Sequence, residues 1–227
     1  MTKQNALIHR LERSFKPRFA VIYPFGFFVL FFCSIYDVSL RAGIGFIIAG
    51  LLVRLWSNGY AIKNDKLTTS GPYAFVRNPL YFGTFLIAIG FVIALQSDPA
   101  WLERVAGAAF LFGLIFMYYG TIKGEQGMLL AKFKEAYSDY SKNVPAIIPC
   151  LVPYMRGEKW PFNLQRLLKS KEHKTVFWIY ILLVVFYLKT RLFIEHKPLT
   201  DSSWNLITIA VFLILLDIAY EFNKKKL

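Results

Sequence analysis

The stretch that decides the fold is residues 77–97, which read RNPLYFGTFLIAIGFVIALQS. A single cation, Arg77, stands just before residues 80–97, a run without any charged side chain. A helix that crosses a bilayer needs about 20 mostly apolar residues. Asn78 suits the N-cap of such a helix, and Pro79 suits its first turn. We therefore predict a membrane-spanning helix that begins at Pro79.

Five further runs have a similar length and polarity, so the fold class predicted is all-α, a polytopic bundle of about six transmembrane helices. The composition agrees, because only 18% of the 227 residues are charged and 56% are hydrophobic, whereas a soluble domain is about 25% charged. A disordered chain, a disulfide scaffold and an ordinary soluble domain are excluded. The five runs are 19–36, 42–62 around Arg54, 105–122, 175–188, which a snorkelling Lys189 could extend to about Ile194, and 202–220 with Asp217 near its end.

The net charge of +13 follows the pattern of a membrane protein. Of the 27 Lys and Arg residues, 21 lie before the first run, after the second, after the fourth or after the last. The positive-inside rule then places both termini and these segments in the cytoplasm, next to anionic inner-leaflet lipid. Nucleic-acid binding is not expected. No cleavage-site pattern follows the first run, which predicts a retained helix.

The cysteines and histidines do not indicate a metal site or a disulfide. Cys33 lies inside an apolar run and Cys150 follows a loop proline, so both are predicted to be free thiols. His9, His173 and His196 are far apart and not at the spacing of metal ligands.

The segment before the helix at Pro79 suits an anion site. Ser70-Gly71-Pro72-Tyr73 predicts a turn. The backbone N–H groups at a helix start can hold an anion, and Arg77 adds a fixed positive charge. The alternative is a capped membrane helix with a snorkelling arginine.

The segment from Glu125 to Pro145 predicts an amphipathic helix that continues from the fourth run. Its apolar side chains recur at helical spacing, and Pro145 and Pro149 end it. Glu125 falls about one turn beyond the apolar run, near the bilayer edge. An acid there is either solvated or faces a cavity in which it could hold an ammonium group. The recurring side chains are Leu129, Phe133, Tyr137 and Tyr140.

Together the two segments resemble a known family of integral membrane enzymes, the isoprenylcysteine carboxyl methyltransferases and phospholipid methyltransferases. One segment reads Gly-Pro-Tyr-x-x-x-Arg-Asn-Pro-x-Tyr, and the other reads Glu-x-x-x-Leu-x-x-x-Phe-x-x-x-Tyr-x-x-Tyr-x-x-x-Val-Pro. The resemblance covers about residues 45–150. Paired, the motifs are fairly specific, whereas either one alone would be a weak signal.

The resemblance implies S-adenosylmethionine (SAM) as the cofactor, bound at the cytoplasmic face of the helices, and Glu125 matches the acid that contacts it. The residues implied in binding are Lys66, Leu67, Thr68 and Tyr73, then Asn78, Pro79, Leu80 and Tyr81 of the cofactor motif, and Glu125. The charges suit SAM: Arg77 fits its carboxylate and Glu125 a cationic group, so Arg77 and Glu125 are the predicted catalytic residues. Tyr73 and Tyr81 could pack on adenine or the sulfonium.

Two departures from the family pattern bear on the substrate. Asn78 stands where the family has histidine, and asparagine cannot carry charge or shuttle a proton. The prenylcysteine enzymes also place an arginine four residues before the glutamate, where this chain has Thr121, and Lys123 falls on another helix face. We therefore expect an amine acceptor, such as a phosphatidylethanolamine-like headgroup, or another lipophilic small molecule, rather than a prenylcysteine carboxylate.

The resemblance suggests three parts: residues 1–150 as the methyltransferase-like core, 151–174 as a basic interfacial linker, and 175–227 as two additional transmembrane helices. The linker is either an amphipathic segment on the inner leaflet or a basic connection held by its neighbours. The last two helices could mediate homo-oligomerisation, and Arg54 could snorkel or contribute to the site. Small residues in two of the spans could allow close helix packing: Gly43, Gly45 and Gly50, and Gly107 with Ala108, Ala109 and Gly113.

Two other functions stay open at this point. Membrane reductases that use NADPH are similar around the Arg-x-Pro-x-Tyr turn and the Tyr-x-x-Tyr-x-x-x-Val-Pro helix. A non-catalytic membrane scaffold or transporter subunit is the other alternative, although the spans show no internal repeat.

Overall fold

The computed structural model of the chain describes residues 17–62 and 66–224. Several basic residues of the segments predicted to be cytoplasmic lie outside the described residues: Lys3, Arg10, Arg13, Lys16, Lys63, Lys225 and Lys226.

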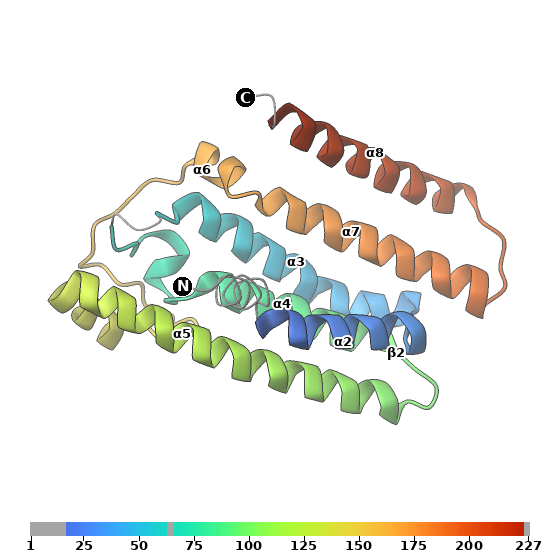
Figure 1. Cartoon of the computed structure of the whole chain (residues 1–227), viewed down its shortest axis with the longest axis horizontal. Coiled ribbons are helices and arrows are strands. Elements are labelled where there is room, and N and C mark those ends of the chain that lie inside the picture. The colour runs from blue at the N-terminus through green and yellow to red at the C-terminus, as the bar shows by residue number, and fades with distance from the viewer. Residues whose placement is uncertain (1–16, 63–65, 225–227) are drawn as a thin grey trace, which may run out of the picture.

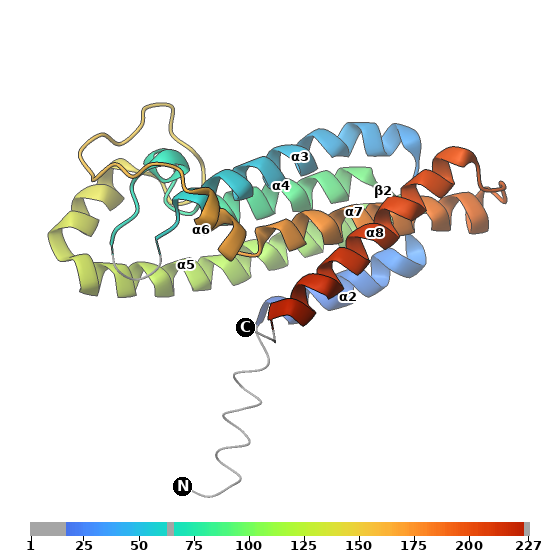
Figure 2. The same cartoon turned by 90° about the horizontal axis from the view of Figure 1, so that it is seen from above.

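Six long helices dominate the described part of the chain and confirm the all-α membrane bundle. They alternate in direction and lie side by side along one axis (Figures 1 and 2). The helices are α2 (Pro17–Phe32), α3 (Asp37–Tyr60), α4 (Pro79–Ala94), α5 (Trp101–Asn143), α7 (Glu172–Lys189) and α8 (Asp201–Lys224). Shorter elements connect them: β1 (Ser34–Ile35), η1 (Gly71–Ala74), β2 (Leu95–Gln96), α6 (Leu164–Lys169) and a π-helical turn, η2 (Thr190–Ile194).

Four of these helices are long and apolar enough to cross a membrane: α3, α5, α7 with η2, and α8 up to Tyr220. Two others, α2 and α4, have 16 residues each and are shorter than the runs predicted from the sequence. The reason is that the last residues of both apolar runs are extended and form the strands β1 and β2. Extended backbone rises about 3.3 Å per residue against 1.5 Å in a helix, so these strands carry the chain further with fewer residues.

The two strands close the end of the bundle opposite to Tyr60. They pair antiparallel, with Ser34 opposite Gln96 and Ile35 opposite Leu95. The end of α7 and the start of η2 supply further partners, because Ile35 N donates to Thr190 Oγ1 (3.2 Å) and Lys189 Nζ donates to the Cys33 carbonyl (2.6 Å). Non-helical backbone is tolerated at membrane depth only with such partners. The span extends to Ile194, as predicted, but the Lys189 ammonium group turns inward to the Cys33 carbonyl and does not snorkel.

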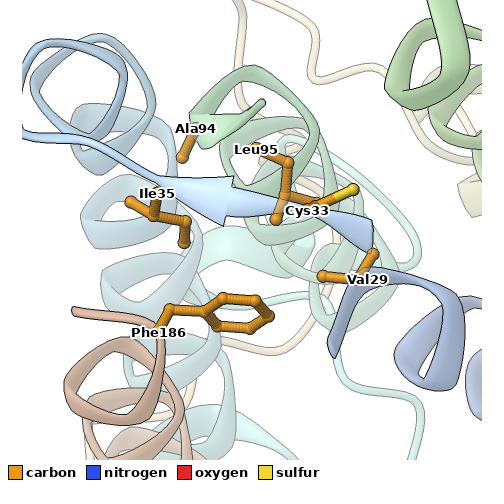
Figure 3. Close-up of a cluster of buried hydrophobic side chains, with 6 residues drawn as sticks. All are labelled: Val29, Cys33, Ile35, Ala94, Leu95 and Phe186. Carbon is orange, nitrogen blue, oxygen red and sulfur yellow. The ribbon is translucent and has the colours of Figure 1, made fainter. Parts of the chain in front are cut away.

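An apolar cluster packs around these strands. It combines residues from α2, β1, α4, β2 and α7, and Figure 3 shows the Phe186 ring beneath β1. Cys33 is completely buried in this cluster, and both cysteines are free thiols, as predicted. The members are Val29, Cys33, Ile35, Ala94, Leu95 and Phe186.

Helices α3 and α4 approach each other closely through glycines. A Cβ on Gly50 would lie 2.5 Å from the Gly83 carbonyl oxygen, and Gly43 meets the carbonyl of Gly90 in the same way. Gly107 likewise fits against Val92. The packing prediction is wrong for Gly45, because a Cβ there would meet nothing within 4 Å.

Helix α5 continues far beyond the apolar run, as predicted, and ends before Pro145. It contains a break that was not predicted, because Lys134 has non-helical angles (φ 46°, ψ −117°). The segment after the break buries Tyr137 and Tyr140, which pack with Leu67 and Phe133. The break therefore turns the last part of α5 toward the segment that precedes α4.

Residues 144–163 form an extended segment that we call the strap. In residues 151–174, the region predicted as the linker, only α6 and the first three residues of α7 are helical. Contacts with neighbouring elements hold this region, as one of the two interpretations predicted: Arg166 of α6 donates to the carbonyls of Gly59 and Tyr60, and Phe162 packs against the Tyr60 ring. Lys174 and Asp217, 2.8 Å apart, join α7 to α8.

Candidate active site

A cavity of about 400 Å³ lies at the end of the bundle where α3 ends and α4 begins. Its walls come from the chain before α4, from the first turn of α4 and from residues 125–140 of α5. The lining residues are Ala61, Ile62, Lys66, Leu67, Thr68, Tyr73, Arg77, Asn78, Leu80, Glu125, Gln126, Met128, Leu129, Lys132, Phe133, Tyr137 and Tyr140.

Most of the site residues predicted from the sequence line this one cavity, although their separation along the chain reaches about 60 residues. Lys66, Leu67, Thr68, Tyr73, Arg77, Asn78, Leu80 and Glu125 all do so. Pro79 does not, because it is fully buried as the first residue of α4. Tyr81 is not in the wall either, but it contacts Glu125. The role of these residues in cofactor binding stays a prediction.

Glu125 is held in place by α4. Tyr81 donates its hydroxyl hydrogen to Glu125 Oε1 at 2.7 Å. The Tyr81 ring packs against Tyr118 of α5 with 4.6 Å between the ring centres, and Phe85 meets the same tyrosine edge-on. A charge-assisted bond of this kind fixes the orientation of the carboxylate. Glu125 therefore faces the cavity, and the solvated alternative is wrong.

Arg77 also faces the cavity. Its Nη1 is 3.3 Å from the Tyr137 hydroxyl group, and its Nε is buried without a hydrogen-bond partner. Its backbone N–H donates to the Pro145 carbonyl (2.9 Å), which ties the residue to the strap. A buried guanidinium nitrogen without a partner is costly and suits an incoming anion. The alternative of a snorkelling arginine is wrong.

Asn78 occupies the N-cap position of α4, but its side chain does not cap the helix. Its Nδ2 donates to the Ala146 carbonyl (2.9 Å), and its backbone N–H donates to the same oxygen (3.2 Å). The Asn78 side chain thus donates to the Ala146 carbonyl of the strap and does not cap the helix. The backbone N–H of Tyr81 already donates to the Asn78 carbonyl, and Pro79 has no backbone N–H. An anion here would therefore depend more on Arg77 than on the helix start.

The turn before α4 forms as predicted and presents Tyr73 to the cavity. Gly71 has a φ of +59°, and a Cβ there would collide with the Tyr60 ring, so this position requires glycine. The Tyr73 carbonyl accepts a hydrogen bond from the Tyr140 hydroxyl group (2.7 Å). Burial raises the pKa of Tyr73, and the Glu125 carboxylate raises it further. Tyr73 is therefore a neutral phenol at physiological pH.

The strap backs the cavity wall by running antiparallel to residues 59–62 and 66–78. Cys150 N donates to the Phe75 carbonyl (2.9 Å) and Tyr154 N to the Ala74 carbonyl (2.9 Å). Further along, Ser70 Oγ bonds with the Glu158 carbonyl and the Trp160 N–H, and Asn163 N donates to the Gly59 carbonyl. Lys66 lies over the Trp160 ring, 4.1 Å from its centre. These bonds hold a non-helical wall in one conformation.

Sequence reasoning missed several lining residues. The sequence did not single out Gln126, Met128 or Lys132. It predicted that this part of α5 is an amphipathic helix, but its apolar face was not assigned to the site. A signal was available for Lys132, because Lys132 stands seven residues after Glu125, shares its helix face and follows Leu129, which was already identified on that face. Lys132 adds a third cation to the cavity, beside Lys66 and Arg77.

Arg54 neither snorkels nor lines the cavity. Its Nε lies 2.5 Å from Glu172 Oε1, and its Nη1 donates to Thr84 Oγ1 (2.6 Å) and to the Leu80 carbonyl (3.2 Å). Asn58 Nδ2 donates to the other oxygen of Glu172, which is buried (3.2 Å). This ion pair connects α3, α4 and α7. It reaches the site indirectly, through the first turn of α4.

The two positions used to predict the acceptor lie away from the cavity. Thr121 is exposed and its hydroxyl group bonds with the Met117 carbonyl of its own helix. Lys123 places its ammonium group 4.8 Å from the centre of the Tyr119 ring. Neither residue lines the cavity, which agrees with the prediction that Lys123 occupies a different helix face from Glu125.

Comparisons with known proteins identify the class. Residues 40–135 match the family model of the phospholipid methyltransferases. The chain is 35% identical over 113 residues to the cobalt-zinc-cadmium resistance protein CzcN of Cupriavidus metallidurans, a match covering 49% of each chain. It is 31% identical over 141 residues to the protein-S-isoprenylcysteine O-methyltransferase of Schizosaccharomyces pombe, covering 56% of this chain and 55% of the relative. The human protein of the same name is 28% identical over 105 residues, covering 44% of this chain and 34% of the relative.

These matches support the family that the motifs predicted, the isoprenylcysteine and phospholipid methyltransferases. The matches span about half of the length of these curated relatives, or less. No solved structure matches the chain. The family segment, residues 40–135, includes α3, α4 and most of α5, and thus most of the cavity wall.

Proposed function

We propose that the protein transfers a methyl group from SAM to a membrane lipid or another lipophilic acceptor. The observation that carries the proposal is the placement of opposite charges, Arg77 and Glu125, on one cavity of about 400 Å³. Small-molecule sites commonly measure about 300–1,000 Å³. The match of residues 40–135 to the phospholipid methyltransferase family supports the same reaction class.

The residues present fit SAM, which carries a carboxylate, an ammonium group and a sulfonium. The buried Nε of Arg77 lacks a partner in the described chain, so a carboxylate would satisfy it. Glu125 would hold a cationic group of the cofactor, and Tyr73 and Phe133 offer ring surfaces to adenine or the sulfonium. When bound, SAM supplies a methyl group on a positively charged sulfur, ready for in-line displacement.

The protein contributes mainly position. Tyr81 fixes the Glu125 carboxylate, and the strap holds the wall that contains Tyr73 and Arg77. Correct placement of two reactants can lower a barrier by about 7–11 kcal/mol. No covalent nucleophile on the protein is required. Because Tyr73 stays neutral, it does not add a negative charge beside Glu125.

An amine is the acceptor that we propose, for example a phosphatidylethanolamine-like headgroup. The support is the exposed Thr121 at the position where prenylcysteine enzymes have an arginine, together with the placement of Lys123 away from the cavity. An amine attacks only when it is neutral, so a base must take its proton. Glu125 or a water molecule could serve as that base.

We also propose that the cavity opens toward the cytoplasm and that both termini lie on that side. The support is the distribution of basic residues, because Lys66, Arg77 and Lys132 and the basic strap are at the cavity end. The same cations would contact anionic lipid of the inner leaflet. Homo-oligomerisation through the last two helices remains a prediction.

The experiment uses purified full-length protein in nanodiscs. SAM binding is measured by calorimetry, and transfer of a labelled methyl group is measured on phosphatidylethanolamine and on a prenylcysteine analogue. Glu125→Gln should weaken SAM binding or turnover by about 10- to 100-fold, since a hydrogen bond to a charged group contributes about 1.5–3 kcal/mol. Glu135→Gln, at an exposed position of the same helix, is the matched control and should behave as the wild type.

Three results would contradict the proposal. NADPH binding in preference to SAM would indicate a membrane reductase. Absence of SAM binding, with normal stability of Arg77 and Glu125 variants, would indicate a non-catalytic scaffold. Methylation of the prenylcysteine analogue alone would overturn the choice of an amine acceptor while leaving methyl transfer intact.

A further inference from the structure

The middle of the strap exposes an unusual number of large apolar side chains. In residues 147–155, which we call the apolar loop, four side chains are mostly exposed: Ile148 (77%), Leu151 (96%), Val152 (77%) and Met155 (63%). Full burial of one such side chain contributes about 1.5–3 kcal/mol. Patches of this kind outside a spanning helix mark an interaction site.

The apolar loop is anchored. The Ala146 carbonyl accepts two hydrogen bonds from Asn78 just before the loop, and Cys150 N donates to the Phe75 carbonyl in its middle. Tyr154 N donates to the Ala74 carbonyl near its end. Because the backbone faces the cavity wall through these bonds, the apolar side chains are directed outward.

The depth of the loop follows from its partners. Asn78 immediately precedes Pro79, where the apolar helix α4 begins, and Ala146 is bonded to Asn78. The far end of the strap is bonded to Gly59 in the last turn of α3. The apolar loop therefore lies where two apolar helices reach the edge of the hydrocarbon layer. Figure 2 shows the strap beside the end of α3, projecting sideways from the bundle.

The positive charges next to the apolar loop also place the loop at the edge of the hydrocarbon layer. Arg156 and Lys159 follow the apolar loop directly, and both are exposed. An apolar segment next to cations is typical of a surface that enters the boundary between headgroups and acyl chains. Basic residues at that level are attracted to anionic lipid by about 1 kcal/mol each.

We propose that the apolar loop inserts Ile148, Leu151, Val152 and Met155 into the lipid leaflet at the cavity end of the bundle. The bilayer that surrounds α3 and α4 is the occupant of this surface, and no second protein is needed. Because the loop is bonded to Ala74, Phe75 and Asn78, the lipid contact also steadies the cavity wall. This inference does not depend on the proposed reaction.

The test measures the depth of a nitroxide label. Leu151→Cys is labelled in a Cys150→Ser background, where the remaining Cys33 is completely buried, and the protein is reconstituted into vesicles of phosphatidylcholine and phosphatidylglycerol. Val152→Cys provides a second reporter, and Glu135→Cys on the exposed face of α5 is the control. Labels at 151 and 152 should collide several-fold more with oxygen than with a polar nickel chelate, whereas the label at 135 should prefer the chelate.

Two outcomes would overturn the inference. Equal access of the chelate to the labels at positions 151, 152 and 135 would place the apolar loop in water. Protection of positions 151 and 152 from both reagents would mean that protein covers the loop, as a second copy of the chain would do.

Discussion

At one end of the bundle, β1 and β2 pair with each other, and Thr190 and Lys189 satisfy Ile35 and Cys33. At the other end, the strap satisfies the non-helical backbone near the cavity, but the Nε of Arg77 stays buried without a partner. At both ends, non-helical backbone groups therefore find hydrogen-bond partners within the protein. The difference is the unsatisfied charge, which separates a surface built for a ligand from one built for stability.

The largest effect is expected from the ion pair at the cavity end. Glu172→Ala leaves the partly buried Arg54 without its carboxylate, and breaking a buried pair costs up to about 3–5 kcal/mol. Thermal unfolding in detergent should show a strongly lowered Tm. Glu172→Gln keeps an acceptor for Arg54 and should cost less. An unchanged Tm in Glu172→Ala would show that the pair does not hold the cavity end together.

A somewhat smaller effect concerns ligand affinity. Arg77→Met removes the guanidinium that we assign to the SAM carboxylate and should weaken binding by about 10- to 100-fold, equivalent to about 1.5–3 kcal/mol. Calorimetry with SAM measures this change. Lys189→Met, the matched loss of a cation at the opposite end, should leave the affinity unaltered. If both variants bind SAM equally well, the comparison between the two ends fails.

The strand end should respond in stability alone. Thr190→Val leaves the N–H of Ile35 without its acceptor, and an unsatisfied buried donor costs about 1–3 kcal/mol. Chemical unfolding should report this loss, whereas the Kd for SAM should stay constant. Thr121→Val, at an exposed position of α5, is a suitable control with a change near zero. A shift in the Kd of Thr190→Val would show that the two ends are coupled.

The smallest effect concerns pH and sharpens the comparison at the cavity end. Burial raises the pKa of Tyr73 above 10.0, and Glu125 adds to the shift. The folded state keeps the phenol protonated while an unfolded tyrosine ionises above about pH 10, so stability should fall as the pH rises through that range. Between pH 6 and 9 Tyr73 should contribute no pH dependence. The alkaline loss of Tm should be smaller in Tyr73→Phe, and an equal loss in both proteins would contradict this assignment.

Much of the fold could be predicted from hydropathy, and the exceptions have a physical reason. The start of α4 at Pro79 and the end of α5 before Pro145 follow from proline chemistry. The pairing of β1 with β2 could not be predicted, because two extended residues inside an apolar run leave no alternating pattern. The break at Lys134 could not be predicted either, because no glycine or proline stands beside it.

The candidate site was predictable where chemistry is local in the sequence. Arg77, Tyr73 and Glu125 stand within two short motifs, and the structure brings them to one cavity. The bond from Asn78 to Ala146 and the pair of Arg54 with Glu172 depend on partners far along the chain. No single segment contains both members of either contact, so their pairing emerges only from the folded arrangement.

The pair of Arg54 with Glu172 also imposes an order on biosynthesis. Glu172 stands 118 residues after Arg54, so at about 5–20 residues per second its synthesis follows by about 6–24 s. During that interval α3 holds an arginine whose insertion costs up to about 2.5–3.5 kcal/mol. Once α7 is inserted, Glu172 pairs with Arg54 and offsets this cost, and the pair connects α3, α4 and α7. Helix α7 thus completes the contact that α3 and α4 begin.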